Sequence, residues 1–384
     1  MTKYGNKGTF EQAQGTSSTA NAPEAKSNIA EIPTFQGGGP NLRRHAVESR
    51  SVLTEQRLEP SMFPEIQIPS LEGVVIEVPS PPPLSEQEIE EAFERLAYES
   101  AVRYPRGPGQ AVQQGDEVIV DLVGYMGGFL LPMTAHEGMR LIVQPDVFLP
   151  GFAAQLIGTP VGQAKMIEVV LPNDFGVEMA RGMGAVFAVE VRDAFRLVVP
   201  DASDPSLFQR MGLGADLAQT MEGVIALLLD QRARQMAQDA VRITLETLLL
   251  RAPFDVSSAL VEAEIQNWWR QTEGRFLLEK GLEREDLETS LEGWLDDPTL
   301  RTDATFRLKS ALFLYAIAKQ ADLASDRKEL KGFLGEVAGA LGIPLDAREK
   351  NLSRDFKERE ILIDHFVYAK ALAYLSEKVT FHYN

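Results

Sequence analysis

Residues 115–124 read GDEVIVDLVG and residues 186–191 read VFAVEV, and these two stretches decide the expected fold. In both, apolar side chains alternate with polar or small ones, which is the period of a strand with one buried face. Residues 166–171, MIEVVL, are a third stretch of this kind. Glycine and proline punctuate the chain between them, as at Pro150-Gly151. The pattern predicts a compact β-rich unit over residues 114–200.

Helical periodicity dominates the chain on both sides of this unit. Upstream, a short strand at residues 74–78 precedes a helix whose start is marked by Ser85 and Glu88, the two partners of a capping box. That helix is expected to end at Pro105. Downstream, strand signals vanish from about residue 205 and apolar residues recur at helical spacing. The helices expected there cover residues 215–250, 257–280, 303–319, 328–341 and 355–379.

Four segments follow from these patterns. Residues 1–62 are predicted to be a disordered tail, because Gly, Ser, Thr, Ala, Asn and Gln cannot bury enough apolar surface to offset the ordering entropy. Residues 63–113 are a linker strand and helix that join the helical body, residues 114–200 are the β unit, and residues 201–384 are a helical domain. We therefore expect an α+β fold in which an antiparallel β domain is inserted into an elongated, all-helical domain.

The composition excludes several kinds of chemistry. The chain has no cysteine, so disulfides, thiolate catalysis and Cys-based zinc sites are excluded, and its four histidines show no metal spacing. No cofactor is therefore expected. A formal net charge of -18 disfavours nucleic acid and anionic lipid as partners, since both require Lys and Arg. Because there is neither a signal-peptide-like start nor a run of about 18 apolar residues, we expect a cytoplasmic protein without membrane contact.

The β-rich unit resembles the FKBP-type peptidyl-prolyl isomerases. The strand at residues 115–124, FLPGF at 148–152, LPNDFG at 171–176 and the strand at 185–191 follow that family's order. The flanks are similar to trigger factor, whose linker the strand and acidic helix before the unit resemble and whose arm helix residues 253–265 resemble. The resemblance covers roughly residues 65–384. It implies a chaperone that binds unfolded or nascent chains and carries an isomerase domain.

The resemblance also implies a catalytic pocket lined by five apolar residues, which are Phe148, Leu149, Phe152, Phe175 and Phe187. Phe148 and Leu149 would form the edge of its floor, and Phe152 would lie under the proline ring. Prolyl isomerisation needs no nucleophile or metal, because its barrier of about 18–20 kcal/mol comes from the partial double bond of the amide. An apolar pocket lowers that barrier by favouring the twisted amide. Since a small β domain also needs buried aromatic residues to fold, Phe187 by itself fits a core as well as a pocket.

Two departures from the family pattern change what we expect. Trigger factors carry a folded N-terminal domain with a Gly-Phe-Arg-x-Gly-Lys-x-Pro loop for ribosome docking, whereas the tail stands in its place here, so ribosome binding by that route is not expected. Phe175 stands where the family usually has a tyrosine, and Leu130-Leu131-Pro132 stands where some FKBPs have an acidic residue. The missing hydroxyl is worth about 0.5–1.5 kcal/mol, which predicts weakened isomerase activity.

Aromatic residues of the helical part indicate a second activity. They occur in pairs or short runs at 268–269, 276–277, 312–315 and 366–368. Most must pack between helices, but a few left exposed in a concavity would bind unfolded segments without sequence preference. Three functions stay open at this point: a ribosome-independent chaperone with modest isomerase activity, an escort for one client docked by residues 1–60, and a structural subunit of a larger assembly that keeps the fold as scaffold.

Overall fold

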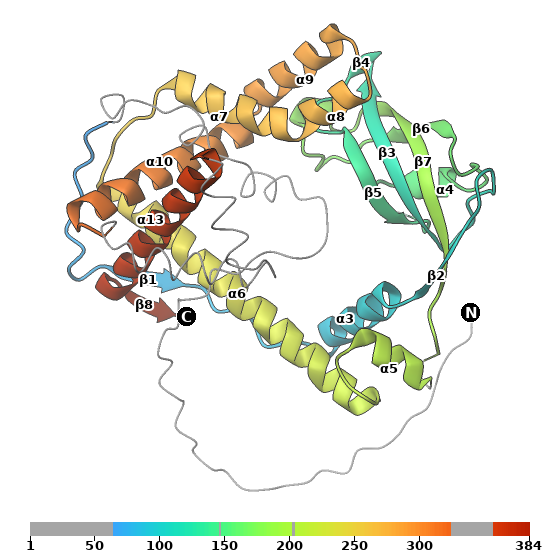
Figure 1. Cartoon of the computed structure of the whole chain (residues 1–384), viewed down its shortest axis with the longest axis horizontal. Helices are drawn as coiled ribbons and strands as arrows, with labels where there is room; N and C mark the ends of the chain where they lie inside the picture. The colour runs from blue at the N-terminus through green and yellow to red at the C-terminus, as the bar shows by residue number, and fades with distance from the viewer. Residues whose placement is uncertain (1–63, 146, 202–203, 324–355) are drawn as a thin grey trace, which may run out of the picture.

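The computed structural model describes residues 64–145, 147–201, 204–323 and 356–384. Figure 1 shows a β-rich head on one side of the molecule and a helical body that curves away from it and returns to it. The α+β fold expected from the sequence is confirmed. The tail expected over residues 1–62 and the helix expected over residues 328–341 lie outside the described residues.

The head is a six-stranded antiparallel sheet with a short helix packed on it. The strand order is β2-β7-β3-β4, with β5 paired to β3 and β6 paired to β7. The elements are β2 (Val102–Pro105), β3 (Asp116–Met126), β4 (Phe129–Leu130), β5 (His136–Ile142), α4 (Phe152–Gln155), β6 (Ala164–Val170), the 3-10 turn η2 (Glu178–Ala180) and β7 (Gly184–Val198). The three strands predicted from alternation are confirmed as β3, β6 and β7.

The core of the head follows the alternation in its sequence. Val118, Val120 and Leu122 of β3 are fully buried, and they pack in one cluster with Phe187 of β7 and Phe152 of α4. β3 and β7 pair from Asp116 opposite Arg196 to Tyr125 opposite Val186, with one register shift. This long central pair is the frame that positions the aromatic residues of the head.

The linker helix α3 (Glu86–Glu99) begins as predicted and ends earlier than predicted. The Ser85 backbone N–H donates to a Glu88 carboxylate oxygen at 2.9 Å, and the Glu88 N–H donates to Ser85 Oγ at 3.2 Å, which completes the capping box. The expectation that the helix ends at Pro105 was wrong. Residues 102–105 instead form β2, because the edge of β7 offers them backbone hydrogen bonds. The sheet therefore begins upstream of residue 114.

The body consists of helices whose boundaries the sequence only partly predicted. They are α5 (Pro205–Met211), α6 (Leu217–Arg251), α7 (Ser258–Gln271), α8 (Glu273–Glu279), α9 (Arg284–Asp296), α10 (Pro298–Gln320) and α13 (Phe356–Lys378). The single helix expected over 257–280 was wrong, since Thr272 leaves helical geometry with φ -119 and ψ -104. Helix α10 begins at Pro298 rather than at 303, because Asp297 accepts from the Leu300 N–H at 2.8 Å and proline suits the first turn of a helix.

A small parallel sheet ties the linker to the C-terminal end of the chain. β1 (Val75–Val78) pairs with β8 (Thr380–Tyr383) with Val75 opposite Thr380. Val74, Ile76 and Val78 are fully buried and pack with residues of α6, α10 and α13. Figure 1 shows this sheet beside the end of α13. The strand at 74–78 was predicted, whereas β8 was not.

The head contacts the body in two separate places. The chain enters the head through α3 and β2 and leaves it after β7, before α5, at one end of the sheet. At the other end, β4 lies against α9 and β5 lies against α8. Figure 1 shows the resulting arrangement, in which α3 and α5 lie near one end of the head's sheet and α8 and α9 lie near the other. We call helices α7, α8 and α9 the arm.

Candidate functional site

Three of the five predicted pocket residues form one aromatic cluster in the head. Phe148 and Phe152 lie with ring centroids 4.9 Å apart, Phe152 and Phe187 lie 5.6 Å apart, and Phe148 and Phe187 lie 6.2 Å apart. All three pairs meet edge to face, which is a favourable arrangement for aromatic rings. The structure therefore brings together rings from the loop before α4, from α4 itself and from β7.

Exposure separates these residues into two groups. Phe152 and Phe187 are fully buried and Leu149 is 4% exposed, whereas Phe148 and Phe175 are half-buried and pack against the same core. In this conformation a peptide can touch Phe148 and Phe175 but not the two inner rings. Phe148 also has φ +71, a left-handed backbone that costs a non-glycine residue about 1–3 kcal/mol. Its position at the rim is therefore held by the surrounding fold.

The turn that carries Phe175 is fixed by its own backbone contacts. The Phe175 N–H donates to the Pro172 carbonyl at 3.1 Å, and Arg181 Nε donates to the Phe175 carbonyl at 2.8 Å. The side chain is thus aimed at the aromatic cluster by a tight turn and by one arginine. Phe175 packs against the core of the head, whereas the sequence gave no signal for Arg181.

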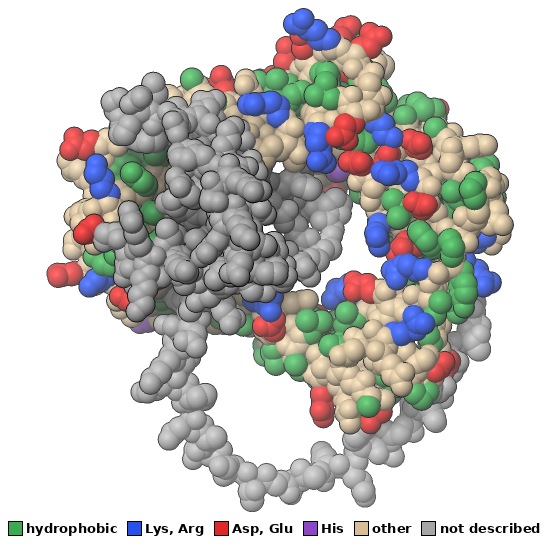
Figure 2. All heavy atoms as spheres, in the orientation of Figure 1, with side chains coloured by type: hydrophobic (Ala, Val, Ile, Leu, Met, Phe, Trp, Pro, Cys, Tyr) green, Lys and Arg blue, Asp and Glu red, His purple; other side chains and the backbone are tan. Residues whose placement is uncertain are grey.

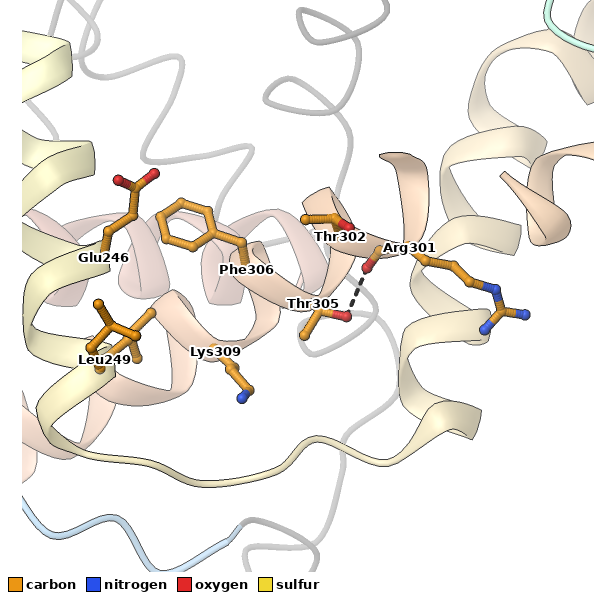
Figure 3. A pocket seen from close by; sticks show the side chains of 8 residues that line it. Glu246, Leu249, Arg301, Thr302, Thr305, Phe306 and Lys309 are labelled. Carbon is orange, nitrogen blue, oxygen red and sulfur yellow. Dashed lines mark hydrogen bonds between the residues drawn. The ribbon is translucent and has the colours of Figure 1, made fainter. Parts of the chain in front are cut away.

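A second candidate site lies in the helical body, where α6 and α10 border a cavity of about 650 Å³. Figure 3 shows Phe306 of α10 and Leu249 of α6 on its two sides, with Glu246 and Lys309 at its edges. Leu250, which also lines it, is 84% exposed. The volume is in the range of sites that bind drug-sized ligands or a few peptide residues. We call this cavity the groove.

The polar groups of the groove are only partly engaged with one another. Thr305 Oγ1 donates to the Arg301 carbonyl at 2.7 Å, and the Arg301 side chain turns away from Phe306 to donate from Nε to the Leu295 carbonyl at 2.6 Å (Figure 3). Lys309 lies 5.6 Å from the Phe254 ring centroid and 3.9 Å from Asp255. The groove thus offers apolar side chains with one anionic residue, Glu246, and two cationic residues, Arg301 and Lys309, among those that line it. Such a surface suits apolar peptide segments of varied sequence.

The aromatic residues predicted to serve the helical part are mostly core. Trp268, Phe276, Phe313 and Phe366 are each at most 4% exposed, as helix packing requires. Tyr315, at 50% exposed, is the one that stays open to solvent in its run. The sequence did not single out the residues that line the groove, because Leu249, Leu250 and Phe306 follow ordinary helical spacing and only helix packing makes them neighbours.

Neither a membrane nor a metal is indicated by the described part of the chain. No helix in it is long and apolar enough to cross a bilayer. Within the same residues, His, Asp and Glu side chains nowhere gather in groups of three or more that could hold a metal ion.

Comparison with known proteins identifies relatives over most of the chain. Residues 217–377 match the family described as bacterial trigger factor protein C-terminus. Trigger factor of Geobacter metallireducens is 26% identical over 321 residues, which are 82% of this chain and 72% of that protein. Trigger factor of Methylorubrum populi is 30% identical over 241 residues, 62% of this chain and 49% of that protein. A solved structure of the trigger factor chaperone is 20% identical, covers 82% of this chain and 73% of that chain, and superimposes with a TM-score of 0.32.

The β head and the helical body give this chain an α+β fold, and its similarity to trigger factors supports a chaperone function. Over most of its length the chain is similar to trigger factors. It spans from about half to about three quarters of the length of the relatives above.

Proposed function

We propose that the chain holds unfolded polypeptide segments in the groove between α6 and α10, and that its head contributes slow prolyl isomerisation. The observation that carries the holding function is the groove itself, a cavity of about 650 Å³ with Leu249, Leu250 and Phe306 on its walls. Its affinity for any one segment is low, because few apolar contacts are available. Low affinity and little sequence preference are what a general holding chaperone needs.

The isomerase function rests on the aromatic cluster of the head. Phe148 and Phe175 present half-buried rings at its rim, and Phe152 supports them from within. A proline ring that docks against Phe148 and Phe175 loses its water shell, which favours the less polar twisted amide over the planar one. Because Phe152 and Phe187 are fully buried, close contact with them requires neighbouring side chains to move, and we therefore expect a slow reaction.

The experiment for holding compares two leucines of the same helix. Leu250→Asp places a charge in the groove, and the expected result is that about fivefold more chaperone is needed to suppress aggregation of an unfolded client, as expected for losing about 1 kcal/mol of apolar contact. Leu229→Asp is the matched control, because Leu229 is 53% exposed on α6 and does not line the groove. Equal suppression by both variants overturns the assignment to the groove.

The choice of client separates this proposal from its rivals. A general chaperone suppresses aggregation of several unrelated unfolded proteins, whereas an escort protects one client and a structural subunit protects none. Testing three unrelated clients with the same pair of variants decides among these functions.

A further inference from the structure

The loop between β4 and β5 of the head is seated on the arm. The segment 130–135, which reads LLPMTA, consists of the last residue of β4 and this loop, and it lies against α8 and α9. The sequence singled out Leu130-Leu131-Pro132 only as a departure from a family pattern. In the structure the same segment makes the contact that closes the head onto the arm.

The centre of the contact is a buried carboxylate that binds the backbone of the loop. Glu273, the first residue of α8, is 4% exposed. Its two carboxylate oxygens accept from the backbone N–H of Met133 at 2.9 and 3.1 Å. The indole N–H of Trp294, on α9, donates to the same carboxylate. The arm thus places a buried carboxyl acceptor beside a main-chain N–H, a group that every residue except proline carries.

Apolar surfaces surround this carboxylate on both sides. Met133 packs against the cluster that contains Trp269 and Trp294, and Leu130 and Ala135 pack in one cluster with Phe276 and Leu277. Gly293 of α9 lets Pro132 approach, since a Cβ built on Gly293 would lie 2.1 Å from Pro132 Cγ. The arm therefore has an acceptor for the backbone, flanked by apolar side chains that contact residues before, within and after a turn at residues 132–133, where Met133 has φ +65.

The rim of the contact is charged. Lys280 Nζ lies 2.7 Å from Asp121 and 2.7 Å from Glu190, both in the head, and Arg275 lies 3.6 Å from Glu137. Figure 2 shows basic and acidic side chains side by side where the arm meets the head. These ion pairs hold the head in place without taking part in the contacts of the loop itself.

We propose that the arm surface formed by Glu273, Trp269, Trp294, Phe276 and Leu277 is a peptide-binding site for an apolar segment that can form a turn, and that the head's own segment 130–135 occupies it as an intramolecular ligand. Docking of the head and binding of a client at this site then exclude each other. The inference rests on the proposed holding function and adds a site outside the groove that is closed until the head leaves.

The mode of contact explains which ligands the site takes. A carboxyl group that accepts hydrogen bonds from backbone N–H groups places no requirement on the side chains of the ligand. The neighbouring apolar side chains disfavour polar segments. Folded proteins do not offer free backbone donors next to apolar side chains, so the site selects unfolded chains. Because the loop is covalently attached, its effective concentration is high and a free client competes only after the head is loosened.

The test uses the tryptophans of the chain as the reporter. All three tryptophans, Trp268, Trp269 and Trp294, belong to the arm, so intrinsic fluorescence reports on this site. The probe is a synthetic peptide with the sequence of residues 128–136, GFLLPMTAH. Lys280→Glu puts a negative charge beside Asp121 and Glu190 and should release the head. The matched control is Arg284→Glu, the same charge change at a side chain that is 90% exposed and pairs with Glu288 on its own helix.

The expected result is at least tenfold tighter peptide binding by Lys280→Glu than by the wild type and by Arg284→Glu. Adding Glu273→Ala to Lys280→Glu should abolish the gain. Equal affinity in all variants, or a gain that survives Glu273→Ala, overturns the proposal. A second route to the open state is Met133→Asp, which changes only the loop. If Lys280→Glu is misfolded by circular dichroism, this variant gives the same expectations.

The proposal for the groove and the proposal for the arm site can be refuted independently of each other. Leu250→Asp tests the groove by suppression of aggregation, and the peptide titration tests the arm. Loss of suppression in Leu250→Asp together with unchanged peptide affinity in Lys280→Glu leaves the proposed function standing and removes the arm site. The reverse pattern leaves the arm site standing and removes the groove.

Discussion

Protonation of Glu273 is predicted to control how firmly the head is held on the arm between pH 5 and pH 8. Burial raises the pKa of Glu273 to about 7 from its usual 4.5, although hydrogen bonds from Trp294, Met133, Ala135 and Ser290 act in the opposite direction. When the head leaves, the carboxyl group meets water and its pKa falls back toward 4.5. The docked state therefore binds a proton that the open state releases.

The sign and size of the effect follow from these two pKa values. Because the pKa is higher in the docked state, docking is fully stabilised below about pH 4.5 and loses stability as pH rises through about 7. At about 1.4 kcal/mol for each pKa unit, the whole span is worth about 3 kcal/mol. Between pH 5 and pH 8 the opening equilibrium constant should rise roughly 50- to 100-fold.

The absence of cysteine makes the assay simple, since two introduced cysteines are the only labelling sites. Met166→Cys on β6 and Glu285→Cys on α9 are both exposed and lie in the head and the arm. Energy transfer between dyes at these positions should fall from pH 5 to pH 8 as the open state gains population. In Glu273→Gln, which carries no titrating group at this position, most of that change should disappear.

Other charged groups at the contact need a control. Asp121 is buried, which raises its pKa, but the Lys280 ammonium and the Gly138 N–H outweigh this and hold it below its usual value, and Asp121 and Glu190 raise the pKa of Lys280. Neither group titrates between pH 5 and pH 8. Because histidine is the residue type that most often changes charge near neutral pH, the measurement is repeated with His136→Gln at the start of β5. A pH response that is unchanged in Glu273→Gln refutes the reasoning.

Four further predictions concern the head and the body. Phe152→Ala should lower any prolyl isomerase rate at least tenfold and cost about 3–5 kcal/mol of head stability, measured with an X-Pro peptide and by denaturant unfolding, whereas Phe175→Tyr should raise the rate up to about tenfold if its hydroxyl reaches the substrate carbonyl. Gly124→Ala should destabilise the head by about 1–3 kcal/mol in the same unfolding measurement, because its Cβ would lie 2.6 Å from Thr134 Oγ1 and 2.8 Å from a Phe187 ring carbon. Asp297→Ala should cost about 1 kcal/mol, seen as a lower unfolding midpoint of the body, since Asp297 caps α10.

Local sequence predicted the elements that carry strong periodic or capping signals. The capping box at Ser85 marked the start of α3, and alternation marked β3, β6 and β7. These signals are local, because a cap needs only residues three apart and a half-buried strand needs only alternate side chains. The missed elements had weaker local signals. Helix α9 has no side-chain cap at its start, and β2 and β8 are four-residue strands that exist only where a distant partner offers hydrogen bonds.

Some features of the candidate site could likewise be predicted from the sequence, and others could not. The resemblance of residues 148–152 and 171–176 to a known family placed Phe148, Phe152 and Phe175 near one another, and the structure places all three against one core. It did not predict that Phe152 is fully buried while Phe148 and Phe175 reach the surface. Exposure depends on how closely the loop before α4 packs on β7, and spacing along the chain does not encode that closeness.

What the sequence determined by itself is the class of fold, the order of head and helical body, and the absence of cysteine chemistry, because composition and short-range periodicity suffice for each. What only the tertiary structure decided is where distant segments meet. Glu273 and Met133 are 140 residues apart in the chain, and their hydrogen bonds exist only because the arm turns back onto the head. A buried carboxylate needs donors to offset its lost hydration, and nothing near Glu273 in the sequence indicates that a backbone N–H of the head would be one of them.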